Sequence, residues 1–201
     1  MSGSFDFDIV IRSIPTLWEG MLLTLLLTVL AIGGGILGGT FLALCRLSPF
    51  RWLSFVGGSY VNFFRSMPLI LVIFWFYFLV PLIVGRPVGS FYSVLIAFVL
   101  FEAAYYCEII RAGISSVGRG QVAAGQALGL TYRQNMRYIV LPQAFRNMIP
   151  VLLTQAIVLF QDTSLVYVVG LHDFLVNAEI VAHRDNRLIE INDKGAVTYL
   201  L

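Results

Sequence analysis

The chain has 201 residues, of which 59% are hydrophobic and 12% charged, and its mean hydropathy is +0.87. Soluble domains contain about 45–50% apolar and about 25% charged residues, so this composition excludes a soluble enzyme, a disordered tail and a nucleic-acid-binding module. The net charge of +2 is too small for a polyanionic partner. The length allows one all-α integral membrane domain of four or five helices and no further soluble domain.

Four segments are apolar and long enough to span a membrane as helices, which takes roughly 20 residues each. The second contains Arg65 as its only charge, and Pro68 is predicted to kink it because proline lacks a backbone N–H donor. The acidic N-terminus has no basic stretch and no small-residue cleavage site, so we expect the first span to be retained. The predicted spans are residues 21–44, about 55–84, 87–110 and 147–170.

Glycines are concentrated in the first span. Gly34 with Gly38, and Gly35 with Gly39, form two overlapping GxxxG patterns, which predict close packing against another helix. Residues 33–40 also match a phosphate-binding loop, except that Gly39 replaces the lysine and no strand precedes the segment. We therefore favour helix packing and do not expect this chain to bind ATP.

The arginines predict the orientation of the chain in the membrane. Residues 45–54 hold Arg46 and Arg51 and no acid, and residues 111–146 hold five arginines and no acid. Because basic residues are retained on the cytoplasmic side, both segments are expected inside and the N-terminus outside.

The predicted cytoplasmic loop 111–146 is long for a chain of this size, and loops of this length are usually functional or disordered. Gly129 is expected to cap one helix, and Thr131 to begin a second that Pro142 ends. From composition, the loop is either a docking element for a soluble partner or an amphipathic helix lying on lipid headgroups. Its apolar stripe consists of Val122, Ala123, Ala127, Leu128 and Leu130.

No catalytic or metal site is expected. The sequence contains neither GxSxG nor HExxH, and the residues around Asp162 do not resemble an intramembrane protease. His172 and His183 lie in a polar tail without typical ligand spacing, so we expect solvated loop histidines.

Several motifs together resemble one family. Gly120-Gln-Val-Ala-Ala-Gly-Gln-Ala-Leu-Gly-Leu130, followed by Arg137-Tyr-Ile-Val-Leu-Pro-Gln-Ala144, resembles the EAA loop of ABC importer permeases, in the branch that imports polar amino acids. The resemblance extends through Tyr60–Leu69, Glu108–Ile114 and Gln161–Leu165 and covers about residues 15–190. The run Leu153–Val169 is most similar to glutamate/aspartate permeases.

This resemblance implies a type I ABC importer transmembrane domain in residues 1–190, in a bacterial inner membrane. It implies a permease subunit that carries polar amino acids, with glutamate and aspartate the expected substrates. It also implies three partners besides membrane lipid: a cytoplasmic ATPase dimer, a second permease subunit, identical or different, and an external amino-acid-binding protein. The chain would be no enzyme and bind no cofactor, since ATP would be held by the partner. The implied ATPase-coupling residues are Gly120, Gln121, Ala123, Ala127, Leu128, Gly129, Leu130 and Pro142.

Two departures from the family pattern stand out. The acid of the EAA motif falls on Ala123, which removes one charged contact with the ATPase, so docking is expected to be weaker. Family members have a fifth span after the Glu190 region, whereas residues 191–201 form an atypical tail far short of 20 apolar residues. The fifth span is therefore expected to be missing or altered, and the tail to end outside.

Charged residues in hydrocarbon are costly and mark functional sites by default. Glu102 is one such residue, and Glu108 is another that is expected to pair with Arg111 one turn later. Arg65 either lines the route or lies near the cytoplasmic end of its span and extends to the interface. An anionic substrate would be repelled by Asp162 unless a cation such as Arg65 neutralises it. The candidate substrate path is Arg65 with the mid-span polar run Gln161, Asp162, Thr163 and Ser164.

The composition is also compatible with two other classes of membrane protein. An ion-coupled carrier or passive channel is the first, but a secondary carrier should contain paired repeats, and residues 15–85 and 90–170 show no similarity. A membrane enzyme is the second, and the sequence offers it no nucleophile and base.

Overall fold

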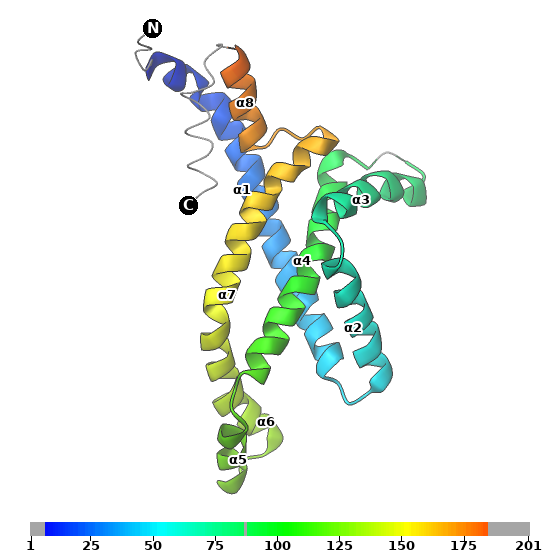
Figure 1. Cartoon of the computed structure of the whole chain (residues 1–201), viewed down its shortest axis with the longest axis vertical. Helices are drawn as coiled ribbons and strands as arrows, with labels where there is room; N and C mark the ends of the chain where they lie inside the picture. The colour runs from blue at the N-terminus through cyan, green and yellow to red at the C-terminus, as the bar shows by residue number, and fades with distance from the viewer. Residues whose placement is uncertain (1–6, 87, 185–201) are drawn as a thin grey trace. The chain divides into compact units, whose positions relative to one another are not determined.

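The computed structural model describes residues 7–86 and 88–184, and every regular element within these ranges is a helix (Figure 1). This confirms the all-α prediction for the described part of the chain. The predicted tail, residues 191–201, lies outside the described residues. The helices are α1 (Phe7–Leu47), α2 (Arg51–Arg65), α3 (Leu69–Val84), α4 (Ser90–Ser115), α5 (Arg119–Ala127), α6 (Tyr132–Asn135), the π-helical η1 (Met136–Val140), α7 (Leu141–Asp162), the 3-10 helix η2 (Thr163–Val169) and α8 (Phe174–Arg184).

By length and apolar composition, three helical segments of the described chain are able to cross a membrane: Ile11–Leu47, Ser90–Ser115 and Tyr132–Val169. A fourth crossing exists if α2 and α3 form one broken span, since the pair is bent by 105°. The kink predicted at Pro68 is thus a complete break. The residue before a proline avoids helical geometry, and the proline itself donates no hydrogen bond, so α2 ends and α3 begins anew.

The prediction that Pro142 ends a helix is wrong. Pro142 is the second residue of α7, and the helical segment runs from Tyr132 to Val169 through it. The wider turn of η1 precedes the proline, and the N–H of Leu141 bonds the carbonyl of Met136, five residues back. This register change lies directly before a residue that has no N–H to donate.

The chain divides into two compact units, which we describe separately. The unit made of residues 31–72 and 96–156 contains the glycine seam predicted from the sequence. A β-carbon on Gly35 would lie 2.8 Å from the Glu102 β-carbon, and one on Gly39 would lie 2.6 Å from the Tyr106 β-carbon. A β-carbon on Gly33 would meet nothing within 4 Å, so it lies off the seam. The helix-packing interpretation is confirmed, with α4 as the partner.

The other unit, residues 1–30, 73–95 and 157–201, holds a helix that sequence analysis missed. Residues of the expected polar tail form α8, which lies beside the first part of α1 (Figure 1). The Asp173 carboxylate caps it by accepting from the N–H of Val176 at 3.0 Å. Asn177 Nδ2 then donates to the Thr16 carbonyl at 2.9 Å. His172 precedes α8 and His183 lies on it, both exposed, so only His172 is a loop histidine.

Candidate functional site

The hairpin formed by α5 and α6, residues 119–135, has well-defined ends. Helix α5 stops at Ala127, and Gly129 follows with a φ of +78°, a left-handed conformation that favours glycine. The N–H of Leu130 bonds the carbonyl of Gly125 at 3.1 Å, which closes the turn. Thr131 and Gln134 then form a reciprocal capping box at the start of α6. Both local predictions, the cap at Gly129 and the start at Thr131, are confirmed.

The inner face of this hairpin is tied to the rest of its unit. Asn135, which is buried, donates from Nδ2 to the Val122 carbonyl at 2.8 Å and so connects α6 to α5. Gly125 is buried too, and a β-carbon there would lie 2.6 Å from Ile139 Cδ1 and 2.8 Å from Asn135 Oδ1. Below the hairpin, Val122 packs on a buried cluster. That cluster consists of Val117, Val140, Ala144 and Met148.

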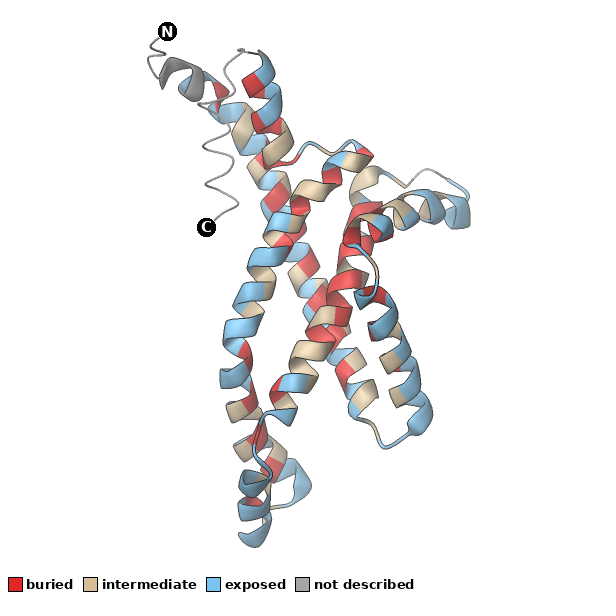
Figure 2. Cartoon of the chain, viewed as in Figure 1, coloured by how far each residue is buried: buried red, intermediate tan, exposed pale blue. Residues whose placement is uncertain are grey.

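The outer face carries most of the predicted coupling residues. Leu128 is 80% exposed, and Tyr132, which sequence analysis did not single out, is 78% exposed. Figure 2 shows this end of the chain largely in the colour of exposed residues. The predicted apolar stripe is split, because Val122 and Leu130 are half-buried. Of the coupling candidates, Pro142 lies outside the hairpin on α7, whereas the exposed ones within it are Gly120, Gln121, Ala123, Ala127, Leu128 and Gly129.

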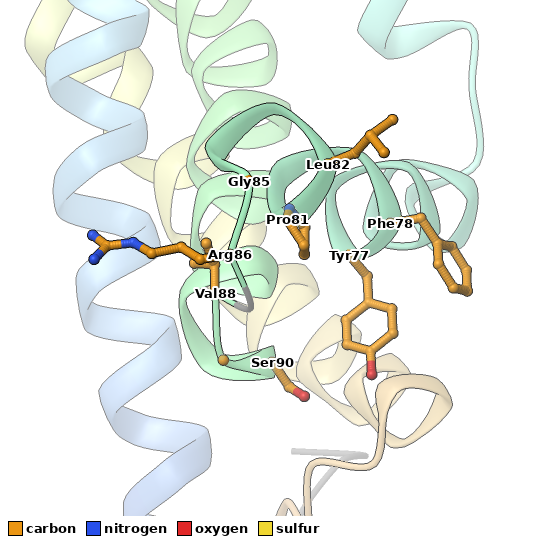
Figure 3. Close-up of a pocket in the computed structure, with 9 residues that line it drawn as sticks. Tyr77, Phe78, Pro81, Leu82, Gly85, Arg86, Val88 and Ser90 are labelled. Carbon is orange, nitrogen blue, oxygen red and sulfur yellow. The ribbon is translucent and has the colours of Figure 1, made fainter.

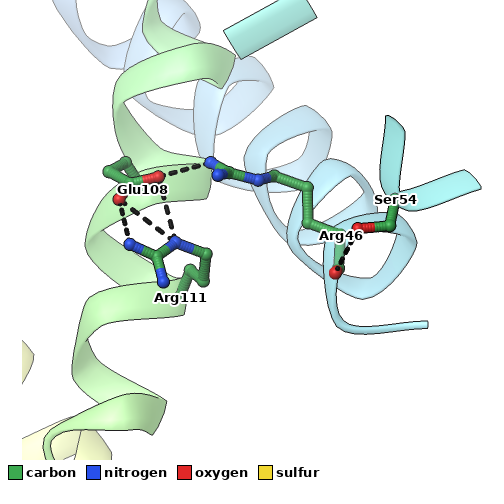
Figure 4. Close-up of polar contacts among 4 residues, drawn as sticks. All are labelled: Arg46, Ser54, Glu108 and Arg111. Carbon is green, nitrogen blue, oxygen red and sulfur yellow. Dashed lines mark hydrogen bonds and ion pairs between the residues drawn. The ribbon is translucent and has the colours of Figure 1, made fainter. Parts of the chain in front are cut away.

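A shared carboxylate joins two helices of the same unit (Figure 4). Glu108 accepts hydrogen bonds from Arg111, one turn further along α4, with Nε lying 3.1 and 3.2 Å from the two oxygens. This pair was predicted. Glu108 also pairs with Arg46 at the end of α1, which was not predicted. The Ser54 hydroxyl donates to the backbone carbonyl of Arg46 at 3.1 Å, so α2 is joined to the end of α1 beside this ion pair.

Glu102, flagged as a costly charge in hydrocarbon, is completely buried on α4. Gln155 Nε2, on α7, donates to its two carboxyl oxygens at 3.0 and 3.1 Å. Gln155 was not predicted as a partner of Glu102, because a single glutamine in an apolar helix does not indicate which residue it contacts. The contact provides hydrogen bonds to the buried Glu102 carboxylate, and buried polar groups are almost always hydrogen-bonded.

Arg65, a substrate-path candidate, is the last residue of α2, so it does not lie near the Arg51 end of that helix. Its guanidinium carbon lies 5.3 Å from the centroid of the Tyr105 ring, within cation–π range.

The other path candidates are consecutive residues at the junction of α7 and η2. They belong to the unit made of residues 1–30, 73–95 and 157–201. Asp162 is the final residue of α7 and is half-buried, while Thr163 is buried and donates to the Phe160 carbonyl at 2.7 Å. Ser164 is half-buried and Gln161 is exposed. The run lies close to the end of the helical segment that begins at Tyr132.

A hollow of about 580 Å³ lies where α3 ends and α4 begins (Figure 3). Tyr77 and Phe78 line it, and the Arg86 side chain extends away from these two rings. It contains none of the predicted site residues. Within the described ranges, no group of three or more His, Cys, Asp or Glu side chains is placed to hold a metal ion.

The chain is similar to known membrane components of transport systems. Residues 35–187 match the family described as the binding-protein-dependent transport system inner membrane component. The chain is 50% identical over 194 residues to the glutamate/aspartate import permease protein GltK of Escherichia coli, covering 93% of this chain and 87% of that protein. It is 35% identical over 199 residues to the arginine transport system permease protein ArtQ of Bacillus subtilis, covering 98% and 91%.

Two solved structures have the same fold. The crystal structure of an amino acid ABC transporter with histidines superposes with a TM-score of 0.88 at 32% identity, covering 100% of this chain and 92% of that chain. An inward-facing MetNI methionine ABC transporter superposes with a TM-score of 0.68 at 20% identity, covering 100% and 91%.

Proposed function

Because this chain belongs to the family of inner-membrane components of binding-protein-dependent transport systems, and is a permease subunit of an ABC importer, we propose that it imports glutamate and aspartate. The 50% identity to a glutamate/aspartate import permease over 93% of the chain carries the choice of substrate. A passive channel or ion-coupled carrier is not favoured. Gly38 and Gly39, in the segment that resembles a phosphate loop, pack against α4, which supports placing ATP on a separate cytoplasmic ATPase.

The 119–135 hairpin is the proposed contact with that ATPase. Leu128 and Tyr132 are exposed on a hairpin whose turn is fixed by Gly129 and the Thr131 capping box and whose inner face is pinned by Asn135. A rigid, partly apolar projection suits docking in a cleft of a soluble protein better than a flexible loop would. The chain continues from α6 through η1 into α7, so a displacement of Leu128 is passed directly to the first part of α7.

The transport cycle then follows from differential contacts. When ATP binding closes the ATPase dimer, its surface holds one position of the hairpin more tightly than the other, and this biases the packing of the helices. A second permease subunit, identical or different, completes the path, and an external binding protein delivers the amino acid. We place Arg65, Gln161, Asp162, Thr163 and Ser164 along this path, and the N-terminus outside the inner membrane.

Reconstitution tests the proposal. The chain, its ATPase and second permease subunit would be placed in vesicles with the binding protein, and glutamate uptake measured with and without ATP. Uptake is expected only with ATP, and uptake that persists without it would refute ATP coupling. Leu128→Glu and Gly129→Asp are expected to abolish co-purification of the ATPase while membrane insertion is unchanged. Arg12→Glu, a charge change on an exposed residue far along the sequence from the hairpin, is the control.

A further inference from the structure

The charges of the 119–135 hairpin and its surroundings have one sign. No Asp or Glu occurs between Glu108 and Asp162. Within this stretch, four arginines are exposed: Arg119, Arg133, Arg137 and Arg146. Arg137 stacks on its own neighbour, with its guanidinium carbon 6.0 Å from the centroid of the Tyr138 ring. Arg119 begins α5 and Arg133 lies on α6, so along the sequence these two cations lie on either side of an exposed ridge. The ridge consists of Ala123, Ala127, Leu128 and Tyr132.

The shape of the ridge favours a folded protein over a lipid surface. The exposed positions of α5 are mostly small, among them Gly120, Ala123, Ala124 and Ala127, and Leu128 projects beyond them. Helices that lie on membranes insert a face of large apolar side chains, and α5 has only 9 residues and no such face. A small-residue surface instead allows the backbone of a partner to approach closely.

Position 123 is uncharged, so it does not neutralise any of the positive charge of the nearby arginines. Ala123 is exposed on α5, in the stretch where Glu and Asp are absent. A partner that presented cations to this surface would therefore meet only like charge, and like charges brought together across an interface are costly. Carboxylates are the groups that complement it.

We infer that the ATPase surface receiving this hairpin is acidic, with an apolar slot for Leu128 and Tyr132 bordered by carboxylates that face Arg119 and Arg133. The inference rests on the proposed function and specifies the chemistry of its partner. Rim charges act mainly on association rate and on salt dependence, because they remain hydrated. Each arginine is worth about 0.2–1 kcal/mol in such a position, or a factor of up to about five in affinity.

The first experiment measures binding of the purified ATPase subunit, the one that restores ATP-dependent uptake with this chain, to the detergent-solubilised permease. Affinity is expected to fall as salt screens the interface, with the Debye length shrinking from about 10 Å at 0.1 M to about 3 Å at 1 M. Arg133→Glu and Arg119→Glu should each weaken binding by about fivefold or more, because reversal replaces attraction by repulsion. Arg12→Glu, with the same change in charge, should leave affinity unchanged.

Substitutions at Ala123 distinguish an acidic ATPase surface from a basic one, because the two surfaces predict opposite changes in affinity. The family pattern, in which an acid at this position contacts the ATPase, predicts that Ala123→Glu strengthens binding. An acidic surface predicts the opposite, a several-fold loss of affinity relative to Ala123→Gln, which has nearly the same size without the charge. If Ala123→Glu instead strengthens binding, or if affinity does not depend on salt, the acidic surface is refuted while the coupling role stands. If the wild-type chain binds no ATPase at any salt concentration, the proposed function fails with it.

Limited trypsin digestion tests the lipid alternative, because Arg119 and Arg133 are exposed cleavage sites. In nanodiscs of phosphatidylcholine or phosphatidylglycerol, added ATPase is expected to protect the hairpin equally in both lipids. Protection that follows the phosphatidylglycerol content and is indifferent to the ATPase would show a lipid-binding surface and overturn the inference.

Discussion

Replacing Gly39 by alanine should push α1 and α4 apart. The new β-carbon would lie 2.6 Å from the Tyr106 β-carbon, 2.8 Å from the Cys107 nitrogen and 3.0 Å from the Ala103 carbonyl oxygen. These atoms belong to the α4 backbone or are fixed to it, so no side-chain rotation relieves the contact. Ordinary contact begins at 3.4 Å, and 3.4 less 2.6 leaves a shortfall of 0.8 Å that the helices must absorb.

Overpacking of this kind costs about 1–3 kcal/mol. Replacing a helical glycine by alanine also gains about 0.5–1 kcal/mol of backbone entropy, so the net loss is about 0–2.5 kcal/mol. The matched control is Gly33→Ala on the same helix, where the β-carbon would meet nothing within 4 Å. Since the entropy gain is common to both variants, their difference isolates the contact with α4.

Thermal unfolding of the purified chain in detergent is the measurement. One kcal/mol shifts Tm by about 2–4 °C for a chain of this length, so Gly39→Ala should melt roughly 2–12 °C below Gly33→Ala. If the two variants have the same Tm, the close approach of α1 and α4 at this glycine is wrong.

Three further predictions concern other contacts. Glu108→Gln should lower the free energy of unfolding by on the order of 2 kcal/mol, because two guanidinium groups lose their carboxylate, and an unchanged thermal unfolding curve would contradict the shared ion pair. Gly125→Ala should accelerate amide hydrogen exchange in residues 119–135, and adding Ile139→Val should restore part of the protection, since it removes Ile139 Cδ1, which would lie 2.6 Å from the new β-carbon. If the double variant exchanges faster than Gly125→Ala alone, that clash is not the cause. Asn177→Ala should accelerate exchange in α8, whereas an unaltered rate would show that its bond to the Thr16 carbonyl does not hold this helix.

Local chemistry made part of this structure predictable. The conformation at Gly129 and the capping box at Thr131 depend on residues within four positions of each other, so the sequence alone specifies them. The glycine seam of α1 was predictable as a seam, because GxxxG spacing places small residues on one helix face. That α4 is its partner was not, because spacing on one helix says nothing about the other.

The remaining features depend on tertiary contacts or on backbone register. Pro142 appeared to end a helix, and only the π-helical turn before it shows why the helix continues. Arg46 reaches Glu108 across two helices, and a sequence with several basic residues on the same side of the membrane does not single it out. Helix α8 did have a local signal, since Asp173 precedes an apolar repeat, but the surrounding charged residues obscured it.

The break between α2 and α3 has a consequence for how this subunit sits among its neighbours. Helix α2 has 15 residues and rises about 22 Å, short of the ~30 Å hydrocarbon thickness. If α2 starts at one face of the bilayer, the turn at Ser66 and Pro68 is submerged before the far face is reached. Both residues are exposed in the single chain, and irregular backbone at that depth requires water or protein beside it. Lipid acyl chains offer neither water nor protein contacts. The turn therefore requires a neighbouring subunit or a water-filled cavity beside it.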